Sequence, residues 1–488
     1  MKSQITSALS RRGAALGDRL SRASYLQRWV SLGLAIGLIA GGGAVLFYWV
    51  LSEATHLLTG GVAGYHPPRP AGEGGGSGDG ARFSRWWAVP LVVAAGGLAS
   101  GMLVFRLAPE AEGHGTDAAI NAVHRDPRSI RMRAVLVKLV ASAITIGSGG
   151  SGGREGPTAQ ISAGFGSLLA RWLHLTDADG RIAVSVGIGS GIGAIFGAPL
   201  GGAVMAADIV YRDDFDAAAL APGLIASITS YSVFGATFGF HPLFGNIAYQ
   251  FNDPRQLVWF AIIGGLCGLV GLAYSRTFYG AISVTQRLPG SRVIKPAVGG
   301  LLVGLIALAV PQALGTGYGW IQAAFTRQTL LHLSLWIVLA LPLVKILTTS
   351  LSIGTGGSGG IFGPGMLIGA FTGAAVWRLA EPLGWAVPHQ PAAFVAVGMT
   401  ACFGAIARAP LSMILMVAEM TDNIGVIAPA MVAVGIAFLV VRHVDDTIYR
   451  SQPRDRVDVL SPHASSPAGS TSGSPDGNRP ARSAIRQR

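Results

Sequence analysis

The stretch that decides the fold reads IGSGGSGGREGP at residues 146–157 and places an arginine and a glutamate inside a glycine-rich break between two apolar segments. The chain writes almost the same sequence again, IGTGGSGGIFGP, at residues 353–364. The copies are in register at a constant offset, so that Lys138 upstream of the first matches Lys345 upstream of the second. Glycine content alone does not explain a repeat that includes matched lysines and Gly-Pro pairs. The sequence therefore predicts two related halves.

The composition is that of a membrane protein. Half of the 488 residues are hydrophobic, 12% are charged, and the mean hydropathy is +0.50. This mix is not that of a soluble domain. A bilayer crossing takes about 20 apolar residues, and the stretches that reach or approach this length are 30–51, 88–103, 182–207, 257–274, 293–310, 331–347, 393–417 and 427–441. We expect a multi-pass integral membrane protein of the bacterial inner membrane.

The net charge of +12 is concentrated at the two ends of the chain. Basic residues that flank apolar spans are topology signals, so we expect both termini in the cytoplasm and no binding of nucleic acid. The two cysteines, Cys267 and Cys402, lie in apolar runs, which indicates core packing and neither a disulfide nor a metal site. No cofactor is predicted.

The chain divides into three parts. Residues 1–28 form a cytoplasmic N-terminal segment, residues 29–450 the membrane domain with halves at about 29–216 and 217–450, and residues 451–488 a polar tail that we expect to be disordered. Within the first half, residues 60–82 are rich in glycine and proline, and we expect a flexible surface loop that packs no core.

The two glycine motifs point to an anion. Glycine-rich breaks at membrane depth are tolerated where the backbone lines a cavity, and repeated broken helices indicate a transport site near the midplane. Pro157 and Pro364 suit the first turn of a helix, since proline has no N–H to leave unpaired there. Both helix starts then aim free N–H groups and a positive dipole end at one place, which favours an anion.

Glu155 has two interpretations. A carboxylate at this point can occupy the anion position and leave when an anion competes or a proton neutralises it, which would make it a gate. It can also be an ordinary N-terminal carboxylate that stabilises its helix; we favour the gate, because helix stability does not explain a doubled break. The run GSGGSGGR resembles a phosphate loop, but it lacks the Gly-Lys-Ser/Thr ending and follows an apolar helix instead of a strand, so nucleotide binding is not predicted.

These residues resemble the CLC family of voltage-gated chloride channels and chloride/proton exchangers. The resemblance covers about residues 25–455 and is carried by GREGP at 153–157, GGIFGP at 359–364, an APL segment followed by an acidic residue in each half (Asp208 and Glu419), and the tyrosine in DDTIYRSQ at 445–452. It implies an all-α, inverted-repeat bundle of tilted, broken helices that forms a homodimer with one anion pathway per subunit. Such a protein is a transporter of chloride and other small anions and not an enzyme.

The resemblance also implies the site. Glu155 would be the gating glutamate, backbone amides around Ile361 and Phe362 would hold the central anion, and the Tyr449 hydroxyl would cap it from the cytoplasmic side. The anion-binding set is completed by residues that frame the pathway, which gives His114, Gly153, Arg154, Gly156, Gly360, Ile361, Phe362 and Tyr449.

Two departures from the family pattern affect the function. The family's GSGIP is GHGTD here, so His114 stands at the serine position and Asp117 at the proline position. His114 either donates N–H to the anion and makes conduction pH-sensitive, or is a packed neutral histidine. Ile209 stands where the exchangers have an internal proton-transfer glutamate, and isoleucine carries no proton.

The loss of that glutamate favours a gated passive chloride channel, with a chloride/proton antiporter as the alternative. Asp208 or His114 would have to substitute for the missing group in an antiporter. A fluoride or organic-anion transporter is less favoured, because GREGP is intact and the spans carry few polar groups. A membrane enzyme is disfavoured, since the spans offer neither a nucleophile-base pair nor a metal cluster.

Overall fold

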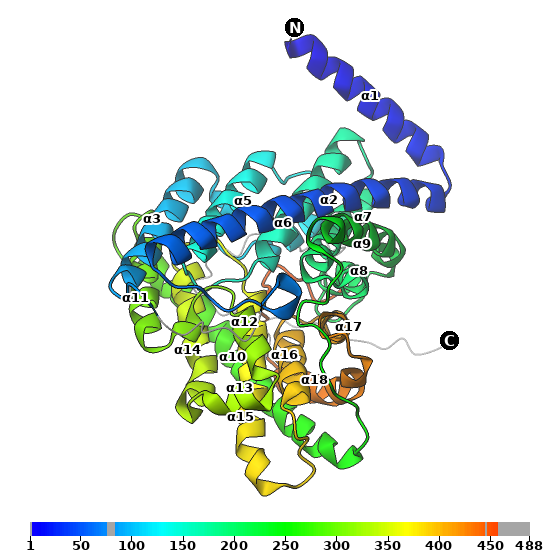
Figure 1. The fold of residues 1–488 in the computed structure, drawn as a ribbon. Coiled ribbons are helices and arrows are strands. Elements are labelled where there is room, and N and C mark those ends of the chain that lie inside the picture. Colours follow the sequence, from blue (N-terminus) through cyan, green and yellow to red (C-terminus); the bar gives the residue numbers. More distant parts are fainter. Residues whose placement is uncertain (1, 76–82, 445–446, 457–488) are drawn as a thin grey trace, which may run out of the picture.

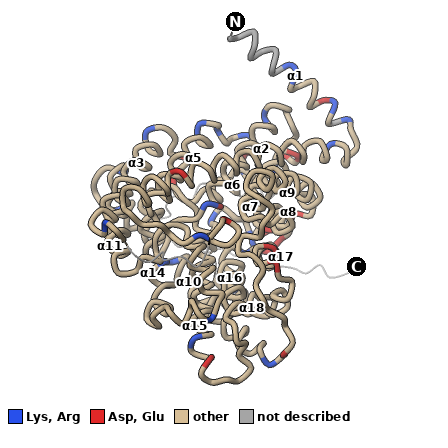
Figure 2. Tube along the Cα trace, in the orientation of Figure 1, with Lys and Arg blue, Asp and Glu red and all other residues tan. Residues whose placement is uncertain are grey.

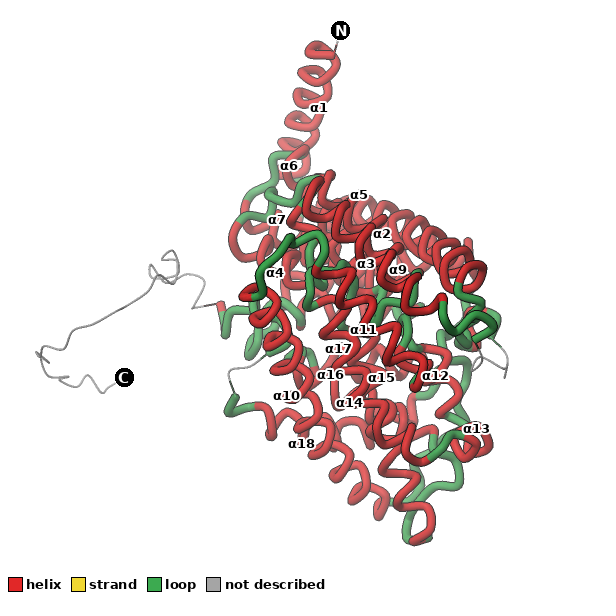
Figure 3. Tube along the Cα trace, turned by 90° about the vertical axis from the view of Figure 1, so that its left-hand side faces the viewer, coloured by secondary structure: helices red, strands yellow, loops and turns green. Residues whose placement is uncertain are grey.

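The computed structural model describes residues 2–75, 83–444 and 447–456, with the side chains of residues 2–10 and 21 left aside. Within these residues the regular elements are helices, at many different tilts (Figure 1, Figure 3). Isolated backbone bridges join Gly113 to Ser358 and Gly153 to Gly360. The predicted all-α bundle is therefore confirmed, and the sparse non-helical pairing is confined to the glycine motifs.

The first half contains seven long or medium helices after the N-terminal α1 (Lys2–Arg22). They are α2 (Tyr25–Thr55), which continues into the π-helical η1 (His56–Val62), α3 (Ala88–Leu107), α4 (Thr116–Arg125), α5 (Met132–Gly147), α6 (Glu155–Trp172), α7 (Asp177–Phe196) and α8 (Pro199–Asp208), with α9 (Ala217–Phe238) opening the second half. Short 3-10 turns lie at η2 (Ala71–Glu73) and η3 (Pro109–Ala111).

The second half repeats this plan. After η4 (Pro254–Gln256) come α10 (Leu257–Arg287), α11 (Lys295–Ala309), η5 (Pro311–Ala313), α12 (Tyr318–Ala324), α13 (Arg327–His332), α14 (Leu335–Ile353), α15 (Phe362–Ala380), η6 (Glu381–Leu383), α16 (Ala392–Ile406), α17 (Pro410–Met420), η7 (Ile424–Val426) and α18 (Ile427–Val441). Helices from the two halves pack together, as α3 does with α11 and α8 with α17.

Six helices among the described residues are long and apolar enough to cross a membrane. The longest is the continuous α2 and η1, over Tyr25–Val62. Their outward faces carry exposed leucines such as Leu38, Leu269 and Leu343, whereas the buried faces carry many glycines and alanines. Small residues let tilted helices approach closely in lipid. The bundle is therefore built for an apolar surrounding.

Two predicted spans are each a pair of helices. The apolar run at 182–207 breaks after Gly197, which has a φ of 65°, and α8 then begins at Pro199. The run at 393–417 breaks in the same way before Pro410. Each of these two apolar stretches is therefore two helices, and the proline at the first position of the second helix leaves no N–H unpaired at the break.

Charged residues are sparse in the body of the bundle and gather on α1 and at helix ends (Figure 2). A few lie inside the bundle (Figure 2), and the buried ones include Arg154 and Glu155 of the first glycine motif. A charge at membrane depth marks function by default, because an unpaired charge there is expensive. The central charges therefore direct attention to the motifs.

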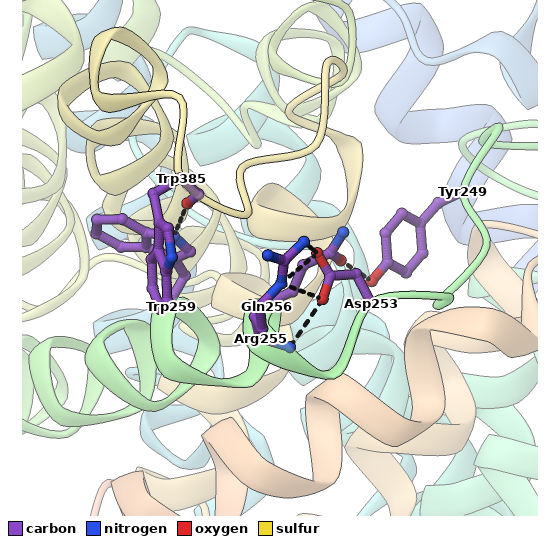
Figure 4. A network of polar contacts seen from close by, with 6 residues as sticks. All are labelled: Tyr249, Asp253, Arg255, Gln256, Trp259 and Trp385. Atoms are coloured by element: carbon purple, nitrogen blue, oxygen red, sulfur yellow. Dashed lines mark hydrogen bonds and ion pairs between the residues drawn. The ribbon is translucent and has the colours of Figure 1, made fainter.

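The start of α10 is held by polar contacts at the edge of the bundle (Figure 4). Trp259 Nε1 donates to the Trp385 carbonyl at 2.9 Å, and the two rings lie 6.2 Å apart. One turn earlier, Asp253 accepts from the Arg255 backbone and pairs with its guanidinium, while Tyr249 donates to Gln256 at 2.9 Å. Paired tryptophans are typical of a membrane-water boundary.

The predicted tail begins too early. Gln452 is buried, and its side-chain amide donates to the carbonyls of Ile209 at 2.7 Å and Ala407 at 3.0 Å. Arg454 and Arg456 then pair with aspartates that follow α8. Residues 451–456 are therefore packed against the bundle and are not a disordered tail. The prediction for 457–488 lies outside the described residues.

Candidate anion pathway

The two glycine motifs meet at the centre of the bundle. The Gly153 N–H donates to the Gly360 carbonyl at 2.7 Å, and the Gly360 N–H donates back to the Gly153 carbonyl at 2.6 Å. The two glycines occupy equivalent positions in the repeat, so this antiparallel pair lies at the junction of the halves. A Cβ on Gly360 would lie 2.8 Å from the Gly153 carbonyl oxygen, which explains why neither position carries a side chain.

The side chain of Glu155, from the first half, contacts the start of helix α15 in the second half. It is the first residue of α6, and its side chain is fully buried. Its Oε2 accepts a hydrogen bond from the Gly363 N–H in the first turn of α15 at 3.1 Å. Within the described residues, Oε1 has no hydrogen-bond partner. The carboxylate thus occupies the place that the free amides of α15 offer to an anion.

The amides predicted to hold the anion lie beside this contact. Ile361 precedes the first residue of α15, and Phe362 begins it, so their N–H groups face no preceding helical turn. The Tyr274 hydroxyl donates to the Ile361 carbonyl at 2.9 Å and fixes that peptide. Pro364 follows in the same turn, as Pro157 does in α6. The predicted pair of facing helix starts is therefore present.

His114 and Tyr449 lie together on one side of this centre, which we call the Tyr449 face. Their ring centres are 5.6 Å apart, and both side chains are buried. Within the described residues, neither His114 Nδ1 nor the Tyr449 hydroxyl has a hydrogen-bond partner. The His114 backbone packs tightly on Gly156, where a Cβ would lie 2.0 Å from the His114 carbonyl oxygen. Two unpaired polar groups thus converge beside the glycine motifs.

The Asp117 carboxylate links the two chain segments that form the Tyr449 face. Asp117, in the first turn of α4, accepts from the Ser451 N–H at 2.7 Å and from its hydroxyl at 2.9 Å. This contact joins the loop of His114 to the segment of Tyr449. Ile209 is fully buried nearby, with its carbonyl bonded to Gln452, and offers no ionisable group at this position.

The Arg154 side chain makes its contacts with Glu73, Tyr48 and Tyr318 and not with His114 or Tyr449. Its guanidinium forms an ion pair with Glu73 and donates to the Ile195 carbonyl at 3.2 Å. The Arg154 Cζ atom lies 5.3 Å from the centre of the Tyr48 ring and 5.0 Å from that of Tyr318. Arg154 therefore adds a buried cation to the region.

Glu73 was missed by the sequence reasoning, and residues 63–75 are not the free loop that was predicted. Tyr65 is buried, the Ala71 N–H donates to Gln322 of α12 at 3.1 Å, and the Gly72 N–H donates to the Leu243 carbonyl at 2.9 Å. This part of the loop lies across the second half and forms what we call the Glu73 face. Figure 3 places α4 and α12 toward opposite edges of the bundle, so the Tyr449 and Glu73 faces are opposite one another.

Polar contacts around the motifs follow the repeat. Lys138 is buried and donates to the carbonyls of Ala111 and Gly113, and Lys345 donates likewise to those of Ala313 and Gly315. Two hydroxyl pairs are also equivalent in the repeat, since Ser142 matches Thr349 and Ser151 matches Ser358. Ser142 pairs with Ser358 and Ser151 with Thr349, with oxygens 2.9 Å apart in each pair. The frame of the site is therefore close to two-fold symmetric.

A series of neighbouring aromatic rings connects Tyr318, near the Glu73 face, with Tyr449. Tyr318 neighbours Phe196, Phe196 neighbours Phe362, Phe362 neighbours Phe403, and Phe403 neighbours Tyr449, with ring-centre distances of 4.3 to 6.2 Å. Aromatic edges carry partial positive charge. In the part of the chain that the structure describes, no group of three or more His, Cys, Asp or Glu residues suits a metal ion.

Comparison with known proteins identifies the family. A sequence profile described as voltage gated chloride channel matches residues 96–442. The chain belongs to the CLC family. One relative, a protein named as a ClcB-like chloride channel protein of Ralstonia nicotianae, is 32% identical over 79% of this chain and 91% of its own length. Another CLC relative, named the H(+)/Cl(-) exchange transporter ClcA of Vibrio campbellii, is 31% identical over 71% of this chain and 75% of its own.

Solved CLC structures share the fold. A slow cyanobacterial Cl⁻/H⁺ antiporter superposes with a TM-score of 0.75 at 24% identity, over 86% of this chain and 96% of that one. A CLC-type fluoride/proton antiporter gives 0.73 at 20% identity, over 88% and 100%. At these identities the likeness shows the fold alone. As a CLC protein, the chain is a multi-pass membrane protein of an anion-transporting family.

Proposed function

We propose that the chain transports chloride and other small anions along a route from the Glu73 face to the Tyr449 face, gated by Glu155. The observation that carries the proposal is the hydrogen bond from the Gly363 N–H to Glu155 Oε2. A carboxylate bound at a helix N-terminus stands in for the anion that the same amides and dipole would hold. Transport then requires the carboxylate to leave, either through competition by chloride or through protonation.

The remaining site residues have complementary roles. The amides of Gly360, Ile361 and Phe362 supply fixed donors for the central anion, and the unpaired His114 Nδ1 and Tyr449 hydroxyl supply side-chain donors from the Tyr449 face. Close backbone approach at Gly153 and Gly156 keeps both helix starts at this point. Chloride is the transported ligand, and no cofactor takes part.

The transport mode that this site favours is a gated passive channel. Ile209 is buried and carries no proton, so the position at which an exchanger would receive a proton from the Tyr449 face is inert. Proton-coupled exchange is the second candidate, favoured by the exchange-transporter and antiporter names of several relatives and structural neighbours. In that case the Asp117 carboxylate, which accepts hydrogen bonds from Ser451 close to Tyr449, would take the role of the proton-transfer glutamate that Ile209 replaces.

The reversal potential of the reconstituted protein tests both candidates. The protein is placed in a bilayer with equal chloride on both sides and a tenfold proton gradient. A channel gives a reversal potential at zero, because chloride alone carries the current. A value displaced toward the proton equilibrium potential would establish exchange, and the Asp117→Asn variant would then return it to zero if Asp117 is the proton acceptor.

We also propose the setting of this activity. Basic residues at both ends of the chain favour an orientation in which the Tyr449 face meets the cytoplasm of a bacterial cell. A homodimer is proposed from membership of the CLC family, and α8 and α17, which pack together and expose Leu200 and Leu411, offer an apolar face for the second copy. Cross-linking in native membranes would test the dimer, and a proteolytic cut of the C-terminus from the cytoplasmic side only would test the orientation.

A further inference from the structure

The buried cation Arg154 lies on the Glu73 side of the gate and is not used by the proposed gating step. Its side chain is only 3% exposed, and it lies between the Tyr48 and Tyr318 rings. Glu73 is its carboxylate partner and is itself 18% exposed. The ion pair therefore lies between Glu155 and the Glu73 face on the proposed route. Its cation belongs to the glycine motif, and its carboxylate belongs to the loop at η2.

Two unpaired donors lie at this site, one on Arg154 itself and one on its neighbour Tyr318. Arg154 Nε and the Tyr318 hydroxyl are both buried, and within the described residues neither has a hydrogen-bond partner. Arg154 and Tyr318 line one cavity of about 110 Å³ together with Glu73. A second cavity, of about 430 Å³, is also lined by Glu73 and Tyr48. A buried donor without an acceptor costs free energy. The cavity lined by Arg154 and Tyr318 therefore favours the binding of a hydrogen-bond acceptor.

The Tyr318 hydroxyl connects this cavity to the gate. A Cβ placed on Gly363 would lie 2.4 Å from that oxygen, and the Gly363 N–H is the donor to Glu155. The cavity at Arg154 is thus next to the Glu155 position along the route. Chloride leaving or approaching the gate on this side passes the one buried guanidinium of the first glycine motif.

We propose that Glu73 is a second gate carboxylate, and that an anion arriving from the Glu73 face displaces it from Arg154 and binds at the guanidinium and the Tyr318 hydroxyl. The ligand is a small inorganic anion such as chloride or bromide, since the cavity has room for little more. This inference rests on the proposed transport function for its place in the route. Glu73 and Glu155 would then act in series, each replaced by the anion that it imitates.

Loop residues make the displacement geometrically reasonable. Glu73 ends η2, and Gly74 follows it with a left-handed φ of 74° and no heavy atom near its absent Cβ. The backbone contacts of Ala71 and Gly72 hold the preceding residues to the second half. The Glu73 side chain can therefore leave Arg154 by rotamer change while its backbone anchor stays in place.

Chloride titration of the purified protein in detergent tests the proposal without requiring turnover. Glu73→Gln keeps the size and hydrogen-bonding capacity of the side chain but removes its charge, so we expect chloride to bind about threefold or more tightly than to the unaltered chain. Glu73→Asp should bind as the unaltered chain does. Glu381→Gln is the matched control, because Glu381 pairs with Arg327 at 2.5 Å away from the route. Adding Arg154→Gln to Glu73→Gln should abolish the gain.

The outcomes separate the two proposals. Unchanged or weaker chloride binding in a monodisperse Glu73→Gln protein would overturn the second gate, as would a gain that survives Arg154→Gln. Chloride efflux from liposomes is measured in parallel with the unaltered chain. Efflux without a gain in binding leaves the proposed function standing and removes Glu73, whereas a gain without efflux supports the anion site and removes the transport function.

Discussion

Asp208, at the end of α8, caps the N-terminus of α17, and Glu419, near the end of α17, caps the N-terminus of α8. Asp208 Oδ2 accepts from the Ser412 N–H at 3.1 Å and from its hydroxyl at 2.5 Å, in the first turn of α17. Glu419 accepts from the Leu200 and Gly201 N–H groups at 2.9 and 2.7 Å, in the first turn of α8. Each carboxylate satisfies N–H groups that its partner helix leaves unpaired. The two acidic residues of the APL segments are thus structural.

Removing one of these caps should lower stability and leave transport unchanged. We expect Asp208→Ala to cost about 1–3 kcal/mol, because it strands the Ser412 donors in a buried place. Thermal unfolding in detergent measures the loss, and Ser412→Ala should show a smaller one. If Asp208 carried protons in place of the missing glutamate, Asp208→Asn would change the pH dependence of chloride flux with little change in unfolding temperature, which would contradict the structural role.

Neutralising the gate should open it. In Glu155→Gln the side chain keeps its shape but not its charge, so its hold on the α15 amides weakens and chloride efflux from liposomes should rise several-fold. Flux through the unaltered chain should increase as the pH falls, because protonation neutralises the carboxylate, and the variant should lose that dependence. Glu110→Gln, at an exposed ion pair with Arg131, is the control. Equal flux in the Glu155→Gln variant and the unaltered chain would remove the gate assignment.

The Tyr449 face should set anion preference. His114→Ala and Tyr449→Phe each remove one buried, unpaired polar group beside the glycine motifs. We expect the bromide-to-chloride permeability ratio to rise in both, since the less strongly hydrated anion depends less on lost donors. Tyr249→Phe, whose hydroxyl bonds Gln256 at the edge of the bundle, should leave the ratio unchanged. Ratios identical to that of the unaltered chain in both site variants would place these residues outside the pathway.

The two buried lysines should be equivalent in stability. Lys138→Met and Lys345→Met each remove a buried ammonium donor from two carbonyl oxygens, those of Ala111 and Gly113 in one case and of Ala313 and Gly315 in the other. We expect similar losses of about 1–3 kcal/mol in unfolding free energy. Chemical denaturation in detergent would detect them. A loss confined to one variant would mean that the repeat relation does not extend to these contacts.

Sequence reasoning succeeded where the relevant interactions are local or repeated. The glycine motifs lie within one short stretch each, so the helix starts at Glu155 and Phe362 were predictable from prolines and glycines alone. Hydropathy then gave the class of fold. Hydropathy alone does not locate the helix breaks before Pro199 and Pro410, because both sides of each break are equally apolar.

The contact between Arg154 and Glu73 could not be predicted in this way. It joins a glycine motif to a loop whose Gly- and Pro-rich composition indicates disorder when read alone, and only the packing of Tyr65 and Gly72 on the second half brings Glu73 inward. The lysine contacts left a weak signal, since Lys138 and Lys345 are matched and each follows a matched glycine loop. The partner of a buried charge depends on tertiary packing, which a single sequence does not record.

The backbone pair at Gly153 and Gly360 gives the route a nearly symmetric frame, but the side chains that follow break the symmetry. Glu155 in one copy corresponds to Phe362 in the other. A charge therefore guards one approach to the centre, whereas an aromatic ring between Phe196 and Phe403 borders the other. Chloride moving in the two directions meets these obstacles in opposite order, so the protein should rectify: at equal and opposite voltages the two currents should differ in size.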